Sequence, residues 1–320
     1  MASIMKYFRF ILIGFYILSL ISCKNPQMNE GYINVEGGQI WYKIIGSADG
    51  IPVLFIHGGP GSRSCQMMHG YSELGENRPL IFYDQLESGN SDRTNDTTLW
   101  KIERFVNEID SIRKYLSLNE LHILGHSWGS AVLIEYLITK NPEGIKSAIF
   151  SSPYISTEAW LNDAGFLLRT LPQYLQDTIR KYEQLQEYQS DAYLAATDSF
   201  YYRFLSRNDW PTQPPPECNG VTEFNETVYY YMWGPSEFTI SGTLKDYDRV
   251  RDLEKIEIST LFIAGEYDEV RAETLKNFHS RVTNSEMAII KGASHYTMIN
   301  NPDETNKKIN DFLKVVENND

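Results

Sequence analysis

A Gly-X-Ser-X-Gly segment between a predicted strand and a predicted helix constrains the fold of this chain more than any other feature. The apolar residues 121–124 predict a buried strand, and Gly125, Ser127 and Gly129 follow it directly. Residues 127–141 then have the pattern of a helix. The glycines permit a tight, strained turn from strand to helix, which lifts the serine hydroxyl above the sheet. Ser127 is therefore the candidate nucleophile of a catalytic site.

Predicted strands alternate with predicted helices along most of the chain. Short apolar runs that are typical of strands occur at residues 39–45, 53–56, 80–83, 121–124, 145–150, 260–264 and 287–290. Between positions 100 and 116, apolar residues recur at helical spacing, at Phe105, Ile109, Ile112 and Leu116. This alternation predicts an α/β fold, with a mostly parallel sheet and helices on both faces. The chain has 320 residues, of which 42% are hydrophobic, and is long enough for such a core.

Residues 154–245 interrupt the alternation. No convincing strand run occurs there, and 14 of residues 181–240 are aromatic, well above the chain average of 13%. We interpret residues 154–245 as a mainly helical cap inserted into a core made of residues 30–153 and 246–320. A separate carbohydrate-binding module is the alternative, but the strands resume after the interval, which favours an insertion.

A glycine-rich segment follows the strand predicted at residues 53–56. It reads His57-Gly58-Gly59-Pro60-Gly61. Acyl transfer needs two backbone N–H groups directed at the developing oxyanion. We expect these from Gly59 and from Trp128, the residue after the candidate nucleophile. A phosphate-binding loop is rejected because no Lys-Ser or Lys-Thr pair follows the glycines.

The remaining members of a catalytic triad lie downstream, in the order serine, acid, histidine. Asp268 is in the loop that leaves the strand predicted at residues 260–264, and His295 follows the strand at 287–290. Asp268 is thus placed to orient a histidine, and His295 to act as general base. The other histidines have structural interpretations: His57 braces its glycine loop and His126 packs beside the turn. No pair of histidines has the spacing of metal ligands, which argues against a catalytic metal.

The N-terminus has the organisation of a targeting segment. Two basic residues precede an apolar run at residues 10–20, and Leu20-Ile21-Ser22-Cys23 follows. This resembles the lipobox of bacterial lipoproteins and predicts a signal peptide at residues 1–22, with Cys23 acylated. We therefore expect an exported, membrane-anchored lipoprotein that faces the periplasm. A plain signal peptide with an incidental cysteine is the alternative. Cys65 and Cys218 remain, as a disulfide or as two separate thiols.

Four segments carry a more specific likeness. They are His57-Gly58-Gly59-Pro60-Gly61, Tyr83-Asp84-Gln85, Gly125-His126-Ser127-Trp128-Gly129 and Gly265-Glu266-Tyr267-Asp268-Glu269. Together they resemble the proline iminopeptidase family of serine peptidases, most closely its tricorn-interacting-factor branch, over residues 32–318. The resemblance implies an α/β-hydrolase core with a helical cap, no cofactor, and release of an N-terminal residue, often proline, from short peptides or amides.

The resemblance also implies a site for the free amine of the substrate. The matching positions are Glu237, Glu269 and Tyr229. A buried ammonium needs carboxylate partners to offset its desolvation. The alternative is that both glutamates are solvated surface residues. The chain departs from the family pattern at residues 84–89, where Asp-Gln-Leu-Glu-Ser-Gly replaces Asp-Gln-Arg-Gly-X-Gly, and this puts substrate detail in doubt.

Three functional hypotheses follow. The first is a serine aminopeptidase that acts on short peptides or amino-acid amides with a free N-terminus. The second is an esterase, lipase or lactonase on the same fold, which would not need the two glutamates. The third is a non-catalytic binding lipoprotein, which the complete triad disfavours. The net charge of −13 argues against a nucleic-acid partner. The preferred N-terminal residue and the oligomeric state stay open.

Overall fold

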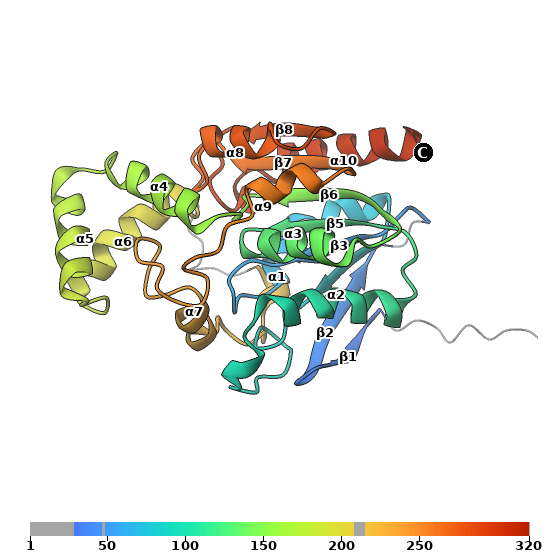
Figure 1. The fold of residues 1–320 in the computed structure, drawn as a ribbon, viewed down its shortest axis with the longest axis horizontal. Helices are drawn as coiled ribbons and strands as arrows, with labels where there is room; N and C mark the ends of the chain where they lie inside the picture. Colours follow the sequence, from blue (N-terminus) through green and yellow to red (C-terminus); the bar gives the residue numbers. More distant parts are fainter. Residues whose placement is uncertain (1–28, 47–48, 208–214, 320) are drawn as a thin grey trace, which may run out of the picture.

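In the computed structural model, which describes residues 29–46, 49–207 and 215–319, eight strands form one central sheet (Figure 1). Their order across the sheet is β1-β2-β4-β3-β5-β6-β7-β8. The strands are β1 (Glu30–Val35), β2 (Gly38–Ile45), β3 (Val53–Ile56), β4 (Leu80–Tyr83), β5 (Leu121–His126), β6 (Ile145–Ser151), β7 (Ser259–Gly265) and β8 (Ser285–Ile290). The predicted signal peptide and Cys23 lie outside the described residues.

The sheet is parallel except at one edge. β1 pairs with β2, and β2 with β4, in antiparallel register, whereas all neighbours from β4 to β8 are parallel. The seven predicted strands are confirmed, and so is the predicted class of fold. β1 was not predicted: only Ile33 of its six residues is buried, so its hydrophobic pattern is weak.

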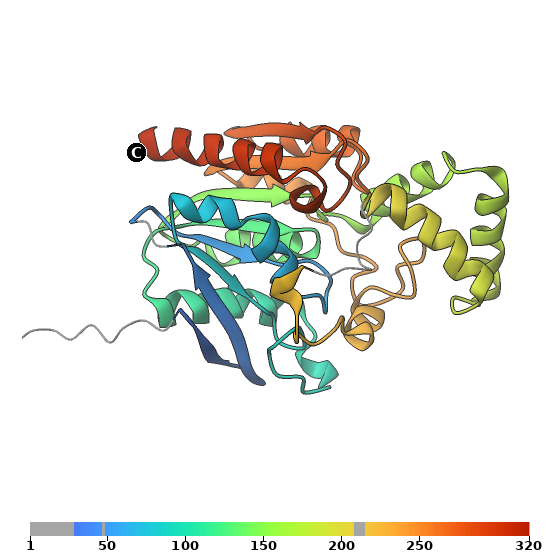
Figure 2. The same cartoon turned by 180° about the vertical axis from the view of Figure 1, so that it is seen from behind.

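Two layers of helices cover the sheet, one on each face. On one face lie α2 (Ile102–Leu116), α3 (Trp128–Lys140) and α8 (Ala272–His279); on the other lie α1 (Cys65–Gly70), α9 (Thr297–Asn300) and α10 (Pro302–Asn319) (Figures 1 and 2). The sequence of β3 is apolar throughout because its side chains pack against both helical layers. Leu54 and Ile56 pack into the first layer, and Val53 and Phe55 into the second, so every position is buried.

In the described part of the chain, four α-helices lie in the interval between β6 and β7. They are α4 (Thr157–Leu168), α5 (Gln173–Leu185), α6 (Asp191–Phe204) and α7 (Glu226–Met232), and no strand occurs among the described residues of this interval. α4, α5 and α6 project from the core as a lobe (Figures 1 and 2). The lobe has its own apolar cluster, which includes Ile179 and Phe200. Because β6 and β7 are neighbours in the sheet, the chain leaves and re-enters the core at adjacent strands.

A disulfide bond joins this interval to the core. It links Cys65, at the start of α1, to Cys218 in the short 3-10 helix η3 (Pro216–Cys218), across 153 positions of sequence. The sequence had left open whether these two cysteines pair. Within the described ranges, none of the helices combines the length and the apolar composition that a membrane span requires.

Candidate active site

Ser127 lies at the turn between β5 and α3, with backbone angles of φ 54° and ψ −121°. A positive φ is strained for a residue that carries a Cβ. The flanking glycines allow the close packing of this turn. A Cβ at Gly129 would lie 2.2 Å from the backbone oxygen of Ile56, and one at Gly125 would lie 2.4 Å from that of Gly129. The turn leaves Ser127 half-buried, with its side chain lining a cavity.

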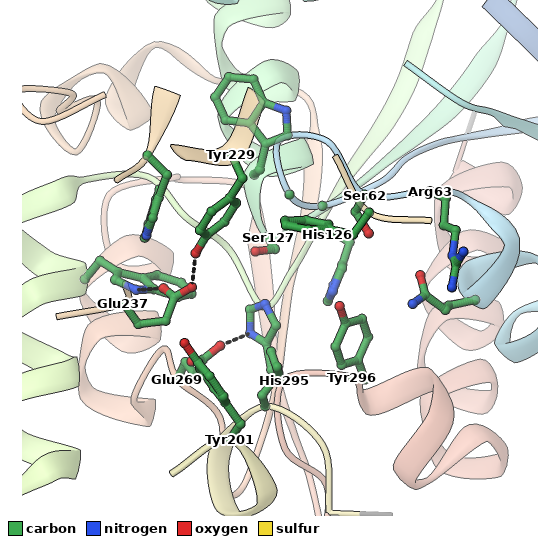
Figure 3. Close-up of a pocket in the computed structure, with 18 residues that line it drawn as sticks. Ser62, Arg63, His126, Ser127, Tyr201, Tyr229, Glu237, Glu269, His295 and Tyr296 are labelled. Atoms are coloured by element: carbon green, nitrogen blue, oxygen red, sulfur yellow. Dashed lines mark hydrogen bonds and ion pairs between the residues drawn. The ribbon is translucent and has the colours of Figure 1, made fainter. Parts of the chain in front are cut away.

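Asp268 and His295 meet at the carboxyl ends of the neighbouring strands β7 and β8. His295 Nδ1 lies 2.8 Å from Asp268 Oδ1. Asp268 Oδ2 accepts hydrogen bonds from the Ser152 hydroxyl at 2.7 Å and from the Gly265 N–H at 3.0 Å. Because the carboxylate accepts at Nδ1, that nitrogen carries the proton and Nε2 is free to act as a base. Figure 3 shows the His295 ring directed toward Ser127.

The glycine loop after β3 lies against Ser127. A Cβ at Gly58 would lie 3.2 Å from the Cβ of Ser127. Gly59 has a φ of 115°, and a Cβ there would lie 2.7 Å from the Ser62 nitrogen, so glycine is needed at this position. Gly59 and Trp128, the two predicted oxyanion donors, both line the cavity that contains Ser127.

His57 and Gln85 brace this loop from behind. His57 Nδ1 donates to the Gly58 carbonyl at 2.8 Å, and its Nε2 accepts from the Gln85 N–H at 3.0 Å. The Gln85 side chain donates to the His57 carbonyl at 2.9 Å and accepts from the Trp128 indole, also at 2.9 Å. The glycine loop and the turn that carries Trp128 are thus fixed relative to each other through Gln85. These contacts agree with the structural role that the sequence predicts for His57, which is to brace the glycine loop.

The loop that departs from the family pattern contacts both the core and the cap. Asp84 Oδ1 accepts from the Ser64 N–H and hydroxyl, each at 2.8 Å. A Cβ at Gly89 would lie 2.1 Å from Asp84 Oδ2, which explains the glycine at the end of this loop. The Glu87 carbonyl accepts from the side chain of Asn225 at 2.9 Å, just before α7. The backbone of this loop therefore supports the segment that leads into α7.

A cavity of about 380 Å³ is lined by Ser127 and His295 of the predicted triad together with the predicted amine-binding residues. Its lining combines the glycine loop, the turn at Ser127, the loops after β7 and β8, and the interval 154–245. The lining residues are Gly58, Gly59, Ser62, Arg63, Gln66, His126, Ser127, Trp128, Trp160, Tyr201, Leu205, Phe224, Tyr229, Trp233, Glu237, Glu269, His295 and Tyr296.

Glu237 reaches the cavity from the interval between β6 and β7 and is held by two donors. Tyr229 donates to its Oε1, and the Trp160 indole donates to its Oε2 at 2.9 Å. Burial raises the pKa of Glu237, while these two hydrogen bonds and the nearby His295 act in the opposite direction. The carboxylate therefore has a fixed position but remains costly to ionise without a cation.

The segment that carries Glu237 is anchored by α5. Glu183 on α5 accepts hydrogen bonds from the hydroxyls of Ser236 and Thr239, which flank Glu237 on either side. Tyr193 on α6 donates to the same carboxylate. Three hydroxyl donors on one glutamate fix the loop, and with it the direction of the Glu237 side chain.

Glu269 directly follows the triad acid and is buried, with a side chain about 4% exposed. Its Oε2 lies 3.9 Å from His295 Nδ1, and its Oε1 has no hydrogen-bond donor among the described residues. Burial, together with the negative charges of Glu237 and Asp268, raises the pKa of Glu269 well above its usual range. Glu269 is thus buried, and Glu237 is partly buried and held by two donors at the same cavity, which excludes the interpretation that they are solvated surface residues.

Several residues in or beside the cavity were missed by reasoning from the sequence. Trp160 and Tyr201 come from α4 and α6, the part of the cap where the family resemblance is weakest, and nothing in their local pattern marks them. Ser152, which orients Asp268, carries one signal: it directly follows β6. It also has a positive φ of 48°, which only the structure reveals. Arg63 follows the glycine segment closely and could have been found by that proximity.

The histidines outside the triad make structural contacts or pack beside the site. Nδ1 of His122 lies 2.8 Å from the Ser147 hydroxyl, His69 pairs with Glu217 at 3.0 Å, and His279 lies 2.8 Å from the Ser285 hydroxyl. The His126 ring packs 4.9 Å from the ring of His295. In the described part of the chain, no three His, Cys, Asp or Glu side chains are grouped as metal ligands.

Comparisons with known proteins agree with this architecture. A family model described as the alpha/beta hydrolase fold matches residues 51–302, and the chain is an α/β hydrolase. It is 40% identical over 292 residues to the proline iminopeptidase of Heyndrickxia coagulans, across 90% of this chain and 99% of that protein. It is 32% identical over 295 residues to the proline iminopeptidase of Clostridium botulinum, across 90% and 98%. The chain belongs to the proline iminopeptidase family. The crystal structure of the Mycobacterium smegmatis proline iminopeptidase superposes with a TM-score of 0.81 at 27% identity, over 90% of this chain and 98% of that one.

Proposed function

We propose that this protein is a serine aminopeptidase that releases an N-terminal residue, proline or another small or hydrophobic residue, from short peptides or amides. The observation that carries the proposal is the pair of carboxylates, the buried Glu269 and the partly buried Glu237, in the same cavity as Ser127 and His295. The relatives named as proline iminopeptidases support the same activity.

In the proposed mechanism, Ser127 Oγ attacks the carbonyl carbon of the first residue while His295 Nε2 takes its proton. Asp268 stabilises the imidazolium that forms, and the Gly59 and Trp128 N–H groups bind the oxyanion. His295 then gives the proton to the leaving amine, which departs as the acyl-enzyme forms. A water molecule, deprotonated by His295, hydrolyses the ester and returns Ser127 to its starting state. These steps need no cofactor.

The two carboxylates restrict the reaction to the first residue. A free prolyl N-terminus is a secondary ammonium with two N–H donors, and Glu237 and Glu269 supply an acceptor for each. Tyr229 completes this subsite by fixing Glu237. An N-acylated proline has neither the charge nor any N–H donor at this nitrogen, and it would leave the buried Glu269 and the partly buried Glu237 without a cation, which is costly. Selection for a free N-terminus follows from that cost.

The test compares substrates that differ only at the amine. We expect the wild-type protein to hydrolyse Pro-nitroanilide and to refuse N-acetyl-Pro-nitroanilide. Efficient cleavage of the blocked substrate would overturn the proposal and favour an esterase, lipase or lactonase on the same fold. A neutral nitrophenyl ester measures the reactivity of Ser127 without the amine subsite. No turnover of any of the three would instead favour a non-catalytic binding protein.

We propose that residues 154–245 act as a cap over a hydrolase core made of residues 30–153 and 246–320. Glu237, Trp160 and Tyr229 come from the cap, whereas Glu269 and the triad come from the core. The amine subsite is therefore complete only when both parts are packed together. This supports a cap that selects the substrate while the core performs the chemistry.

We also propose that the protein is an exported bacterial lipoprotein, with a signal peptide at residues 1–22 and an acylated Cys23 that anchors it on the periplasmic side of a membrane. The lipobox-like sequence before Cys23 supports this location. The Cys65–Cys218 disulfide is in keeping with an oxidising compartment. One acyl chain binds membranes only marginally, so the proposal implies a multiply acylated anchor. Mass spectrometry of the mature N-terminus is the test, and an unmodified Cys23 would refute the anchor.

A further inference from the structure

We infer that Arg63 is the binding residue for a substrate carboxylate on the leaving-group side of the cavity, so that the enzyme favours di- or tripeptides with a free C-terminus. The inference rests on the proposed aminopeptidase function and specifies its substrate class. Its basis is a separation of charge along the cavity, with Ser127 between the two poles.

The acidic and basic residues lie on opposite sides of the nucleophile. Arg63 and Glu237 line the same cavity as Ser127. Figure 3 shows Arg63 on one side of Ser127 and His295, and both Glu237 and Glu269 on the other. Since the carboxylates bind the amine of the first residue, the opposite side receives the part of the peptide that leaves.

Contacts with the cap hold the Arg63 guanidinium in place. Its Nη1 lies 3.3 Å from the carbonyl oxygens of both Val221 and Thr222. The disulfide between Cys65 and Cys218 joins the same two segments, two residues after Arg63 and three before Val221. No carboxylate of the described residues lies within 4 Å of the guanidinium, which has five N–H donors and is half-buried. Donors therefore remain for a ligand.

The pKa of Tyr296 is affected by the acidic residues and by Arg63. Burial and the charges of Glu269 and Glu237 raise the pKa of Tyr296 to about 12, while the positive charge of Arg63 acts against them. Tyr296 lines the cavity on the Arg63 side in Figure 3. Its neutral hydroxyl is available there as a further hydrogen-bond donor to an anion.

Arg63 is the one permanent cation among the lining residues that the structure describes. His126, on the same wall, does not share this role, because burial and the nearby His295 hold the pKa of His126 well below its usual range. A short peptide has matching polarity, with an ammonium at one end and a carboxylate at the other. A peptide with one or two residues after the scissile bond places its carboxylate inside the cavity, whereas a longer peptide carries it out.

The experiment compares free acids with their C-terminal amides. Pro-Gly, Pro-Gly-Gly and Pro-Gly-Gly-Gly are each supplied in both forms. For the wild type, we expect kcat/KM for the free acid to exceed that of the amide by roughly tenfold at one or both of the two shorter lengths, the size of one charge-assisted hydrogen bond in a partly exposed site. The ratio should fall toward one for the longest peptide and with rising ionic strength.

Variants identify the residue responsible. Arg63→Gln keeps a polar amide but removes the charge, and it should bring the acid-to-amide ratio to about one. Arg63→Lys should retain part of the preference. The matched control is Arg281→Gln, which neutralises an arginine that pairs with Glu254, outside the lining of the cavity, and should leave the ratio unchanged. A ratio near one in the wild type, or an unchanged ratio in Arg63→Gln, would overturn the inference.

Binding measurements separate this inference from the proposed function. Calorimetry with Ser127→Ala should show tighter binding of Pro-Gly than of its amide, and the difference should vanish when Arg63→Gln is added. This readout does not depend on turnover. If Pro-nitroanilide is not hydrolysed by the wild type, the proposed function fails, and the calorimetric comparison alone decides whether Arg63 binds carboxylates.

Discussion

Replacing Glu269 with glutamine tests whether this carboxylate binds the substrate ammonium. Glu237 already accepts hydrogen bonds from Tyr229 and Trp160, whereas Glu269 Oε1 has no donor among the described residues. Of the two carboxylates, Glu269 therefore has fewer hydrogen-bond donors and depends more on a bound cation to stabilise its charge. Glu269→Gln preserves the size and one acceptor oxygen of the side chain while removing its charge.

The expected loss follows from one charge-assisted hydrogen bond in a buried site. Such a bond contributes about 1.5–3 kcal/mol, which corresponds to roughly ten- to a hundredfold in kcat/KM at about 1.4 kcal/mol per factor of ten. Because the ammonium also positions the scissile carbonyl over Ser127, we expect both a higher KM and a lower kcat. Hydrolysis of a neutral nitrophenyl ester should change far less.

Glu266→Gln is the matched control. It makes the same substitution in the same loop, but Glu266 is exposed and accepts a hydrogen bond from the Gly292 N–H, which glutamine can also accept. Steady-state kinetics with Pro-nitroanilide should show wild-type values for this control. If Glu269→Gln also kept wild-type kcat/KM, the assignment of Glu269 to the amine subsite would be wrong.

The same variant has an expected effect on stability. The pKa of Glu269 is raised in the folded protein, so the folded state holds its proton more tightly than the unfolded state does. The associated stability is present below the ordinary glutamate pKa of about 4.3 and is lost as the pH rises through the raised value. The Tm of Glu269→Gln should therefore match the wild type near pH 4 and exceed it at pH 8. A variant less stable than the wild type at pH 8 would contradict this reasoning.

Two further predictions follow from the triad and from the disulfide. Ser127→Ala should lower kcat by on the order of 10⁴-fold or more and abolish labelling by fluorophosphonates, with comparable losses for Asp268→Asn and His295→Gln, since the three act as a unit; near-normal turnover of Ser127→Ala would show that the nucleophile is another residue. Replacing Cys65 and Cys218 together with alanine should reduce the free energy of unfolding by about 2–4 kcal/mol, because the bond closes a long loop; a denaturant midpoint equal to that of the wild type would exclude a stabilising role for the bond.

Reasoning from the sequence succeeded where a short stretch of chain carries both its structure and its chemistry. The strand, turn and helix around Ser127 are specified by apolar residues and two glycines, and the structure places the positive φ of Ser127 at that turn. Asp268 follows the buried strand β7 and His295 follows the partly buried edge strand β8, so their meeting at the carboxyl ends of neighbouring parallel strands could be expected. β1 escaped because only one of its side chains is buried, which leaves little pattern to detect.

The environments of Glu237 and Glu269 could not be predicted from local sequence patterns. Their sequence positions came from family resemblance, but the burial of Glu269, the donors on Glu237 and the missing donor on Glu269 Oε1 are properties of the packed tertiary structure. Trp160 lies 77 positions from Glu237 in the sequence and binds it directly. Such contacts depend on how α4 and the loop after α7 approach each other.

The sequence by itself thus determined the class of sheet and the residues of the nucleophilic turn. The spacing of apolar residues and the placement of glycines specify each strand, helix and turn within a few residues. The tertiary structure alone decided that Cys65 pairs with Cys218 and that Arg63 lies opposite the carboxylates. Each of these arrangements joins segments brought together by the packing of the cap on the core. A side chain's charge and size are written in the sequence, whereas its neighbours, and hence its pKa and its free donors, exist only once that packing has formed.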